Sequence, residues 1–108
     1  MRASSARRSA IVFSALGDET RLRLIARLAG GGPMSITGLT AGSKVSRQAI
    51  TKHLHVMQTA GLVQGARCGR ESLWQLDPKR VDEARQYLDV IGRQWDEALA
   101  RLRTFVEE

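Results

Sequence analysis

The clearest pattern of hydrophobic and polar positions lies in the middle of the chain, between Ser43 and Leu62. Ile50, Leu54 and Met57 are spaced so that a helix would bury all three on one side. The opposite side is polar and basic, with side-chain types that bind base edges and phosphates. Its members are Arg47, Gln48, Thr51, Lys52 and His55. The pattern predicts a recognition helix, and the alternative is a charged helix face that meets only water.

The segments on both sides of this helix follow a recognisable order. Upstream, residues 36–41 form a short apolar unit, and a break at residues 42–43 supplies the tight turn of a helix-turn-helix. Ser46 is placed to cap the recognition helix and to bring its hydroxyl close to a bound phosphate. Downstream, Gly61 marks the helix end, and residues 62–67 and 72–76 alternate as two strands would. The order predicts a winged helix, mainly α with a small β-hairpin.

The predicted hairpin carries two arginines at its tip. Arg67 and Arg70 lie beside Cys68 and Gly69. In a winged helix this tip reaches the DNA backbone or the minor groove, where a narrow groove attracts arginine. Because both charges match the sign of the helix face, we expect a wing that contacts DNA, and the alternative is a solvated hairpin tip.

The N-terminal third predicts two further helices. We expect residues 1–5 to be disordered and a short amphipathic helix to follow and end at Gly17. Its apolar positions are Ala6, Ala10, Phe13 and Leu16. Asp18 is a natural N-cap for the next helix, which stops at residues 30–33. The apolar positions of that helix are Leu22, Ile25, Ala26 and Leu28. Ser35 can cap the first helix of the helix-turn-helix, which Gly38 should keep short.

The last segment has the most regular apolar spacing, alternately three and four residues. Its positions are Val81, Ala84, Leu88, Ile91, Trp95, Ala98, Leu102 and Phe105. This heptad pattern predicts one long helix over residues 78–106. Because the seam is longer than a small core requires, we expect it to pack against a second copy of the chain. The alternative is a helix that packs back on its own domain.

Length and charge agree with this picture. The 108 residues suffice for a single domain over residues 1–108, with a core small enough that dimerisation would add stability. The net charge is +6, and residues 41–80 carry seven basic against two acidic side chains, which favours a polyanionic partner. One cysteine suits a reducing cytoplasm, and no apolar run reaches the ~20 residues that span a bilayer. We therefore expect a cytoplasmic protein without a membrane segment.

The run from FSALGDETRLRLIARL through SRQAITKHLHVMQTAGLV to GRESLWQLD resembles the arsenic-repressor (ArsR/SmtB) family of bacterial transcriptional regulators, over roughly residues 10–105. The resemblance implies a winged helix-turn-helix that is dimeric through its first and last helices. The interface residues that it implies are Phe13, Leu88, Ile91, Trp95 and Leu102. Metal-sensing members carry a cysteine pair in the first helix of the helix-turn-helix, or His and acidic ligands in the last helix. This chain has SITGLTA at the first place and no histidine after His55, so it resembles the non-metal branch, and we expect no metal and no cofactor.

The leading hypothesis is a homodimeric repressor that binds a palindromic operator in double-stranded DNA. An alternative is a winged-helix module that uses the same basic face on a protein or an RNA. A third is a repressor that responds to thiol oxidation at Cys68, where neighbouring positive charge would favour the thiolate. No catalytic constellation is visible in the sequence, so we do not expect an enzyme.

Overall fold

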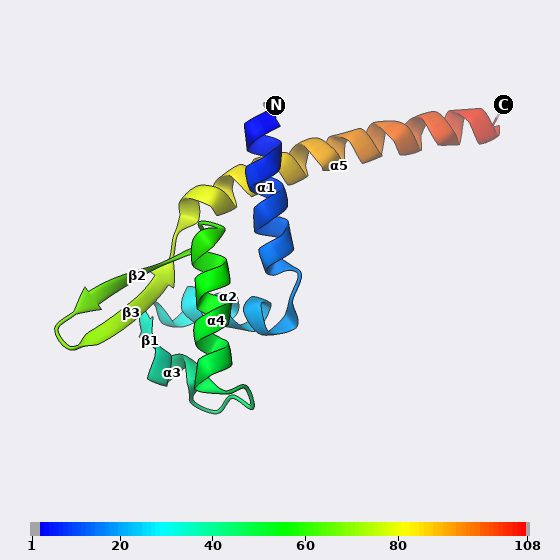
Figure 1. The fold of residues 1–108 in the computed structure, drawn as a ribbon. Helices are drawn as coiled ribbons and strands as arrows, with labels where there is room; N and C mark the ends of the chain where they lie inside the picture. The colour runs from blue at the N-terminus through cyan, green and yellow to red at the C-terminus, as the bar shows by residue number, and fades with distance from the viewer. Residues whose placement is uncertain (1–2, 108) are drawn as a thin grey trace.

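The computed structural model describes residues 3–107, which form five helices and a small antiparallel sheet (Figure 1). In chain order the elements are α1 (Ala3–Leu16), α2 (Glu19–Gly31), β1 (Met34–Ser35), α3 (Ile36–Thr40), α4 (Arg47–Thr59), β2 (Val63–Cys68), β3 (Glu71–Leu76) and α5 (Pro78–Glu107). The predicted fold, mainly α with a β-hairpin, is confirmed. Helices α3 and α4 form the helix-turn-helix, and β2 and β3 form the wing.

Helix α1 begins earlier than the sequence suggested, and its buried face agrees only in part with the predicted one, because Phe13 and Leu16 pack against the core but are only half-buried. Residues 3–5 belong to its first turn, although we expected residues 1–5 to be disordered, and residues 1–2 lie outside the described residues. The buried side chains are Ser9, Val12 and Ala15, whereas Ala10 is exposed. Because α1 contacts α2 and α4 on one side and α5 on another, helical spacing alone did not identify its buried face.

Polar caps fix where three of the helices begin. Asp18, Ser35 and Ser46 each accept a hydrogen bond from the backbone N–H three residues later, at 3.0, 3.1 and 3.1 Å. All three predicted caps are therefore confirmed. Within α2, however, Leu24 and Leu28 are buried, while Leu22 is 51% exposed. Helix α3 spans only five residues, as Gly38 led us to expect.

The end of α4 is set by Gly61, as predicted. Its φ of 81° lies in the left-handed region that side chains with a Cβ rarely adopt. The Leu62 N–H donates to the Met57 carbonyl at 2.9 Å, and the Gly61 N–H donates to the Gln58 carbonyl at 3.0 Å. These two bonds form a Schellman motif, which satisfies the last carbonyls of the helix and directs the chain into β2.

The core lies where α4 meets α2, α3 and the wing. The predicted anchors Ile50, Leu54 and Met57 are each at most 1% exposed. Leu39 of α3 and Leu62, which precedes β2, are equally buried. Burying such side chains stabilises a fold by ~1.5–3 kcal/mol each, so α4 is held firmly from one side.

The sheet has the strand order β1-β3-β2 and is antiparallel throughout. Val63 of β2 lies opposite Leu76, and Cys68 lies opposite Glu71 at the tip of the wing. Strand β1 was not expected, because two residues are too few to show an alternating pattern. It pairs Met34 with Trp74 and leads directly into α3, so the wing is hydrogen-bonded to the segment that begins the helix-turn-helix.

Helix α5 has 30 residues and begins at Pro78. Its first part packs against α1 of the same chain. Ala84 is buried, the Phe13 and Tyr87 rings meet edge to face at 6.5 Å, and Arg8 donates to both Glu83 carboxylate oxygens at 2.7 and 2.8 Å. The remainder extends away from the other elements beyond its crossing with α1 (Figure 1).

The apolar side chains on the outer part of α5 are left in solvent within the single chain. Leu88 is 53% exposed, Trp95 is 64% exposed and Phe105 is 79% exposed. Ile91 is half-buried, and each described side chain after it is exposed. Packing on its own domain therefore accounts for the first part of the heptad seam and leaves the rest without a partner.

Candidate nucleic-acid interface

The outward side of α4 presents the row of polar residues that the sequence singled out. Arg47, Gln48, Lys52 and His55 are exposed, and Thr51 is half-buried. The opposite side of the helix is fixed in the core by its three buried anchors. The row is therefore displayed on a helix that cannot rotate without exposing apolar area.

Two of these side chains already make local contacts. The Arg47 guanidinium donates to the Thr37 hydroxyl on α3 at 3.1 Å, and the Thr51 hydroxyl donates to the Arg47 carbonyl at 2.9 Å. Gln48 and Lys52 make no hydrogen bond to any of residues 3–107. Their polar groups are accordingly available to a ligand in front of α4.

Ser46 has a different role from its neighbours. Its hydroxyl is used as a cap, because it accepts the Ala49 N–H. The N–H groups of the first helical turn that precede Ala49 still point out of the helix end. Such groups, together with the helix dipole, favour an anion at this position.

His55 and the wing lie side by side. The His55 ring lies 5.9 Å from the ring of Trp74 in β3, with a tilt of 54°. Trp74 is buried and also packs against Gly65 of β2, where a Cβ would lie 3.5 Å from the indole. The contact joins the middle of α4 to β3 of the wing.

The tip of the wing is a two-residue turn at Gly69 and Arg70, with Gly69 at φ 63°. Arg67 lies in β2 opposite Ser72, and both Arg67 and Arg70 are exposed. Cys68 is exposed between them and carries a free thiol. The structure thus places Arg70 in the turn of the wing and Arg67 at the end of β2 that leads into it.

One arginine that the sequence did not single out holds the helix-turn-helix in place. Arg27 of α2 donates to the carbonyls of Leu39, Gly38 and Ala41, at 2.7, 2.9 and 3.5 Å. These oxygens end α3, where a positive charge is also favoured by the helix dipole. In the sequence Arg27 looks like any other basic residue on a solvated face, because the contact joins two elements and leaves no periodic signal.

A second arginine of α2 connects that helix to α4. Arg21 donates from Nε to the Ala15 carbonyl and from Nη1 to Nδ1 of His53, the latter at 3.2 Å. The Arg21 backbone N–H donates to Asp18, and this hydrogen bond is the main reason that the pKa of Asp18 is lowered. His53 therefore faces α2, while His55 faces the wing.

Few side chains in residues 3–107 are placed to bind a metal ion together. Within residues 3–107, no three His, Cys, Asp or Glu side chains come together in a way that would hold a metal ion. No helix in the same range is both long enough and apolar enough to cross a bilayer.

Comparison with known proteins agrees with this geometry. The family model described as a helix-turn-helix domain matches residues 16–65. The HTH-type transcriptional regulator Rv2034 of Mycobacterium tuberculosis is 39% identical over 87 residues, which are 81% of this chain and 78% of that protein.

Two solved structures have the same fold. An ArsR-like transcriptional regulator from Rhodococcus sp. RHA1 has a TM-score of 0.81 and 35% identity, with 95% of this chain and 96% of that chain covered. The winged helix-turn-helix domain of Mb0332 from Mycobacterium bovis has a TM-score of 0.67 and 22% identity, with 92% and 88% covered. With helix, turn, helix and wing in this order, and with relatives of this similarity, the chain belongs to the ArsR family of winged helix-turn-helix transcriptional regulators.

Proposed function

We propose that this transcriptional regulator is a homodimeric repressor that binds a palindromic operator through two copies of α4. The observation that carries the proposal is the exposed row on α4, held by a helix whose other side is fully buried. A rigid helix with such side chains suits insertion into the major groove of DNA. A repressor of this kind acts by occupying DNA and needs no catalytic group, so an enzymatic role is not part of the proposal.

The proposed contacts divide by chemistry. Arg47, Gln48 and Thr51 are assigned to base edges, because their side chains are bidentate or short hydrogen-bonding groups. The two local bonds of Arg47 and Thr51 involve exposed or half-exposed groups and can be exchanged for bonds to DNA. The phosphate backbone is assigned to the remaining candidates. These are Ser46, Lys52, His55, Arg67 and Arg70.

Support for the dimer comes from the outer part of α5. Leu88, Trp95 and Leu102 are exposed large apolar side chains on one heptad seam, and Ile91 is half-buried beside them. Phe13 is half-buried against α5 of its own chain, at the edge of this surface. The solution structure of the Mb0332 domain is homodimeric. Two copies of α4 related by a two-fold axis would read half-sites about one helical turn, ~10 bp, or a multiple apart.

We further propose that the regulator works in the cytoplasm without a resident metal or cofactor. Its single cysteine suits a reducing compartment. The two histidines of α4 are engaged with different elements, His53 with Arg21 and His55 with Trp74, so they do not converge on one ion. Operator affinity is therefore expected to be the same with added zinc and with a chelator.

The test is a binding assay on the DNA upstream of the protein's own gene, repeated over a series of salt concentrations. We expect tight binding of one site and a steep fall in affinity with salt, because phosphate contacts release counterions. Shuffled DNA and duplex RNA of the same sequence are the controls. Equal affinity for all three nucleic acids, or no binding to any, would reject an operator-specific repressor in favour of an RNA- or protein-binding module.

A thiol-responsive repressor is the second candidate, and the observation that favours it is the exposed Cys68 between two arginines at the wing tip. Oxidation would add polarity or negative charge beside the DNA backbone and weaken binding. The measurement is operator affinity before and after peroxide, for the natural protein and for Cys68→Ser. An unchanged affinity in the natural protein would leave the repressor without a redox response.

A further inference from the structure

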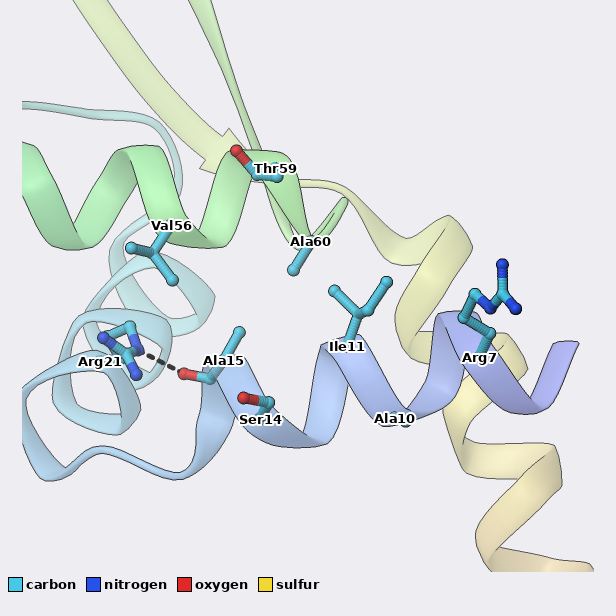
Figure 2. A pocket seen from close by; sticks show the side chains of 9 residues that line it. All are labelled: Arg7, Ala10, Ile11, Ser14, Ala15, Arg21, Val56, Thr59 and Ala60. Carbon is cyan, nitrogen blue, oxygen red and sulfur yellow. Dashed lines mark hydrogen bonds between the residues drawn. The ribbon is translucent and has the colours of Figure 1, made fainter. Parts of the chain in front are cut away.

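A groove between α1 and the end of α4 is left open in the single chain. Its volume is ≈ 490 Å³. Figure 2 shows Ile11 and Ala15 of α1 on one wall and Val56 and Ala60, from the end of α4, on the other. Ile11 is 47% exposed and Val56 is 44% exposed. Because the groove adjoins the proposed dimer surface, its apolar walls are within reach of the second copy of the chain.

The apolar surface of the outer part of α5 is wider than a single coiled-coil seam. Leu99 and Val106 each lie four residues after a seam position, so they add a second row along one flank of the seam. They are 53% and 72% exposed. Two helices of a coiled coil bury a narrow seam, whereas a helix with this wider stripe packs against more than one neighbour. Pairing with the partner's α5 would therefore leave the second row uncovered.

The exposed part of the seam is also short. From Leu88 to Phe105 it covers about two and a half heptads, fewer than the ~3–4 heptads that indicate a coiled coil. A stable interface buries about 800 Å² on each partner. A second contact for α5, beside its seam, would add apolar area where the seam alone supplies little.

The charges beside the groove and beside the second row are complementary. Arg7 lines one end of the groove, is exposed and forms no ion pair with residues 3–107 (Figure 2). Asp96 is exposed on the flank of Leu99 and is likewise without an ion pair in the described range. Arg7 lies one turn before Ile11, and Asp96 lies one turn before Leu99. A contact between Leu99 of one copy and Ile11 of the other can therefore bring the two opposite charges together.

We propose that each groove holds the outer α5 of the second copy, with Leu99 and Val106 seated between α1 and α4. The inference rests on the proposed dimer and extends its surface beyond the first and last helices to α4. Val56 lies on the helix that carries the polar row. Each α4 would then be held by its own core on one side and by the second copy near its C-terminal end.

The direct test uses the natural protein. Mixed dimers of ¹³C-labelled and unlabelled chains are prepared, and isotope-filtered NOE spectra report only contacts between copies. We expect contacts from the Ile11 and Val56 methyl groups to protons of the partner's α5. The Leu102 methyl groups, which lie on the seam, are the positive control. Contacts from Leu102 without any from Val56 would overturn the proposal.

Cross-linking tests the same contact without spectra. Cys68→Ser removes the natural thiol, and Val56→Cys and Leu99→Cys are then introduced into separate proteins, one with a longer tag. We expect mild oxidation of the mixture to give a covalent species that contains one chain of each kind. Glu97→Cys replaces Leu99→Cys in the control, because Glu97 lies two residues away on the opposite side of α5. Equal yields from the two mixtures would contradict the seating of Leu99 in the groove.

Charge reversal tests the polar part of the contact. Arg7→Glu should raise the dimer dissociation constant about three- to tenfold, since each dimer would lose two exposed ion pairs. Adding Asp96→Arg should restore it. Arg23→Glu, on α2 and outside the groove, should leave it unchanged. Sedimentation equilibrium measures all three, and a double variant no tighter than Arg7→Glu would overturn the pairing of Arg7 with Asp96.

The outcomes separate this inference from the proposed function. A natural protein that sediments as a monomer would reject the proposed dimer, and the inference would fail with it. A dimer with Leu102 contacts between copies, but without contacts or cross-links at Val56, would reject only the occupied groove. Operator binding is measured on its own and decides neither result.

Discussion

The Arg27 guanidinium donates a hydrogen bond to the Leu39 carbonyl at 2.7 Å, and this contact ties α2 to the end of α3. The same side chain also reaches the carbonyls of Gly38 and Ala41. These contacts fix the first helix of the helix-turn-helix, on whose Thr37 the Arg47 guanidinium rests. Arg27 is therefore a positioning residue for the polar row on α4, which we propose contacts DNA, without belonging to that row.

Replacing Arg27 by Gln should lower the free energy of unfolding by about 1–2 kcal/mol, since hydrogen bonds from a charged donor to the α3 carbonyls are lost. Urea unfolding measures the change. Arg23→Gln is the matched control, because Arg23 on the same helix makes only an exposed ion pair with Glu19, a contact that contributes about 0.3–0.5 kcal/mol. Similar losses in the two variants would show that the Arg27 contacts do not stabilise the motif.

Substitutions of the proposed base-reading and phosphate-binding residues should differ in how they change the affinity for operator DNA and for random DNA. Gln48→Ala should cost about 1–3 kcal/mol on the operator and little on random DNA, because only the cognate sequence loses a base contact. Lys52→Ala and Arg70→Ala should weaken both DNAs and flatten the salt slope by about one unit each. Fluorescence anisotropy on the two DNAs measures all three. If Gln48→Ala weakens both DNAs equally, Gln48 is not a base reader.

Trp95→Asp should convert the dimer to monomers without unfolding the domain. Trp95 is 64% exposed in the single chain, so a charge there disturbs only the surface that we propose packs between copies. Sedimentation velocity measures the state of association and circular dichroism the helix content. A natural protein that is monomeric at micromolar concentration would show that the proposed dimer does not form.

Gly61→Ala should destabilise the protein by roughly 1–2 kcal/mol, because its φ of 81° is costly for a residue with a Cβ. An added Cβ would also clash with the Arg80 Cγ, so that side chain would have to move. Gly92→Ala is the opposite control. Gly92 lies within α5 with open space around it, and alanine there should stabilise the helix by about 0.5–1 kcal/mol. Thermal unfolding of both variants tests the pair, and a neutral Gly61→Ala would contradict the conformation of this turn.

The ion pair between Arg8 and Glu83 should make the free energy of unfolding depend on pH. The hydrogen bond from Arg8 is the main cause that lowers the pKa of Glu83. Stabilisation by this carboxylate is complete above the ordinary glutamate pKa of about 4.3 and is lost as the pH falls through the lower folded pKa. The free energy of unfolding, measured with urea from pH 6 to pH 2, should therefore fall less steeply for Glu83→Gln than for the natural protein. Asp89→Asn, which changes an exposed carboxylate of the same helix, should keep the natural slope.

Features with a local signal could be predicted from the sequence. The caps at Asp18, Ser35 and Ser46 and the turn at Gly61 each depend on residues within one helical turn, and all four were correct. The buried side of α4 followed from a spacing of apolar residues with only one possible inner face. The order of helix, turn, helix and hairpin was enough to define the fold.

Features that depend on contacts between distant segments could not be predicted. Strand β1 exists because Met34 pairs with Trp74, forty residues later, and nothing in its two residues indicates this. Helix α2 gives two further examples. The spacing of its residues does not indicate that Arg27 is the arginine that reaches α3, or that Leu22 is the leucine that stays exposed. The groove beside Ile11 likewise exists only once α1 and α4 are set against each other.

Helix α5 is one continuous helix with two parts, one that packs on its own domain and one that is exposed. The part up to Ile91 adds Ala84 to the hydrophobic core and sets Tyr87 against Phe13, whereas the described residues beyond Ile91 are all exposed. Folding therefore constrains the sequence of the first part, whereas the proposed dimer would constrain that of the second. A gene duplicate could change its partner by altering only the outer part of α5, and it would keep the same polar row on α4.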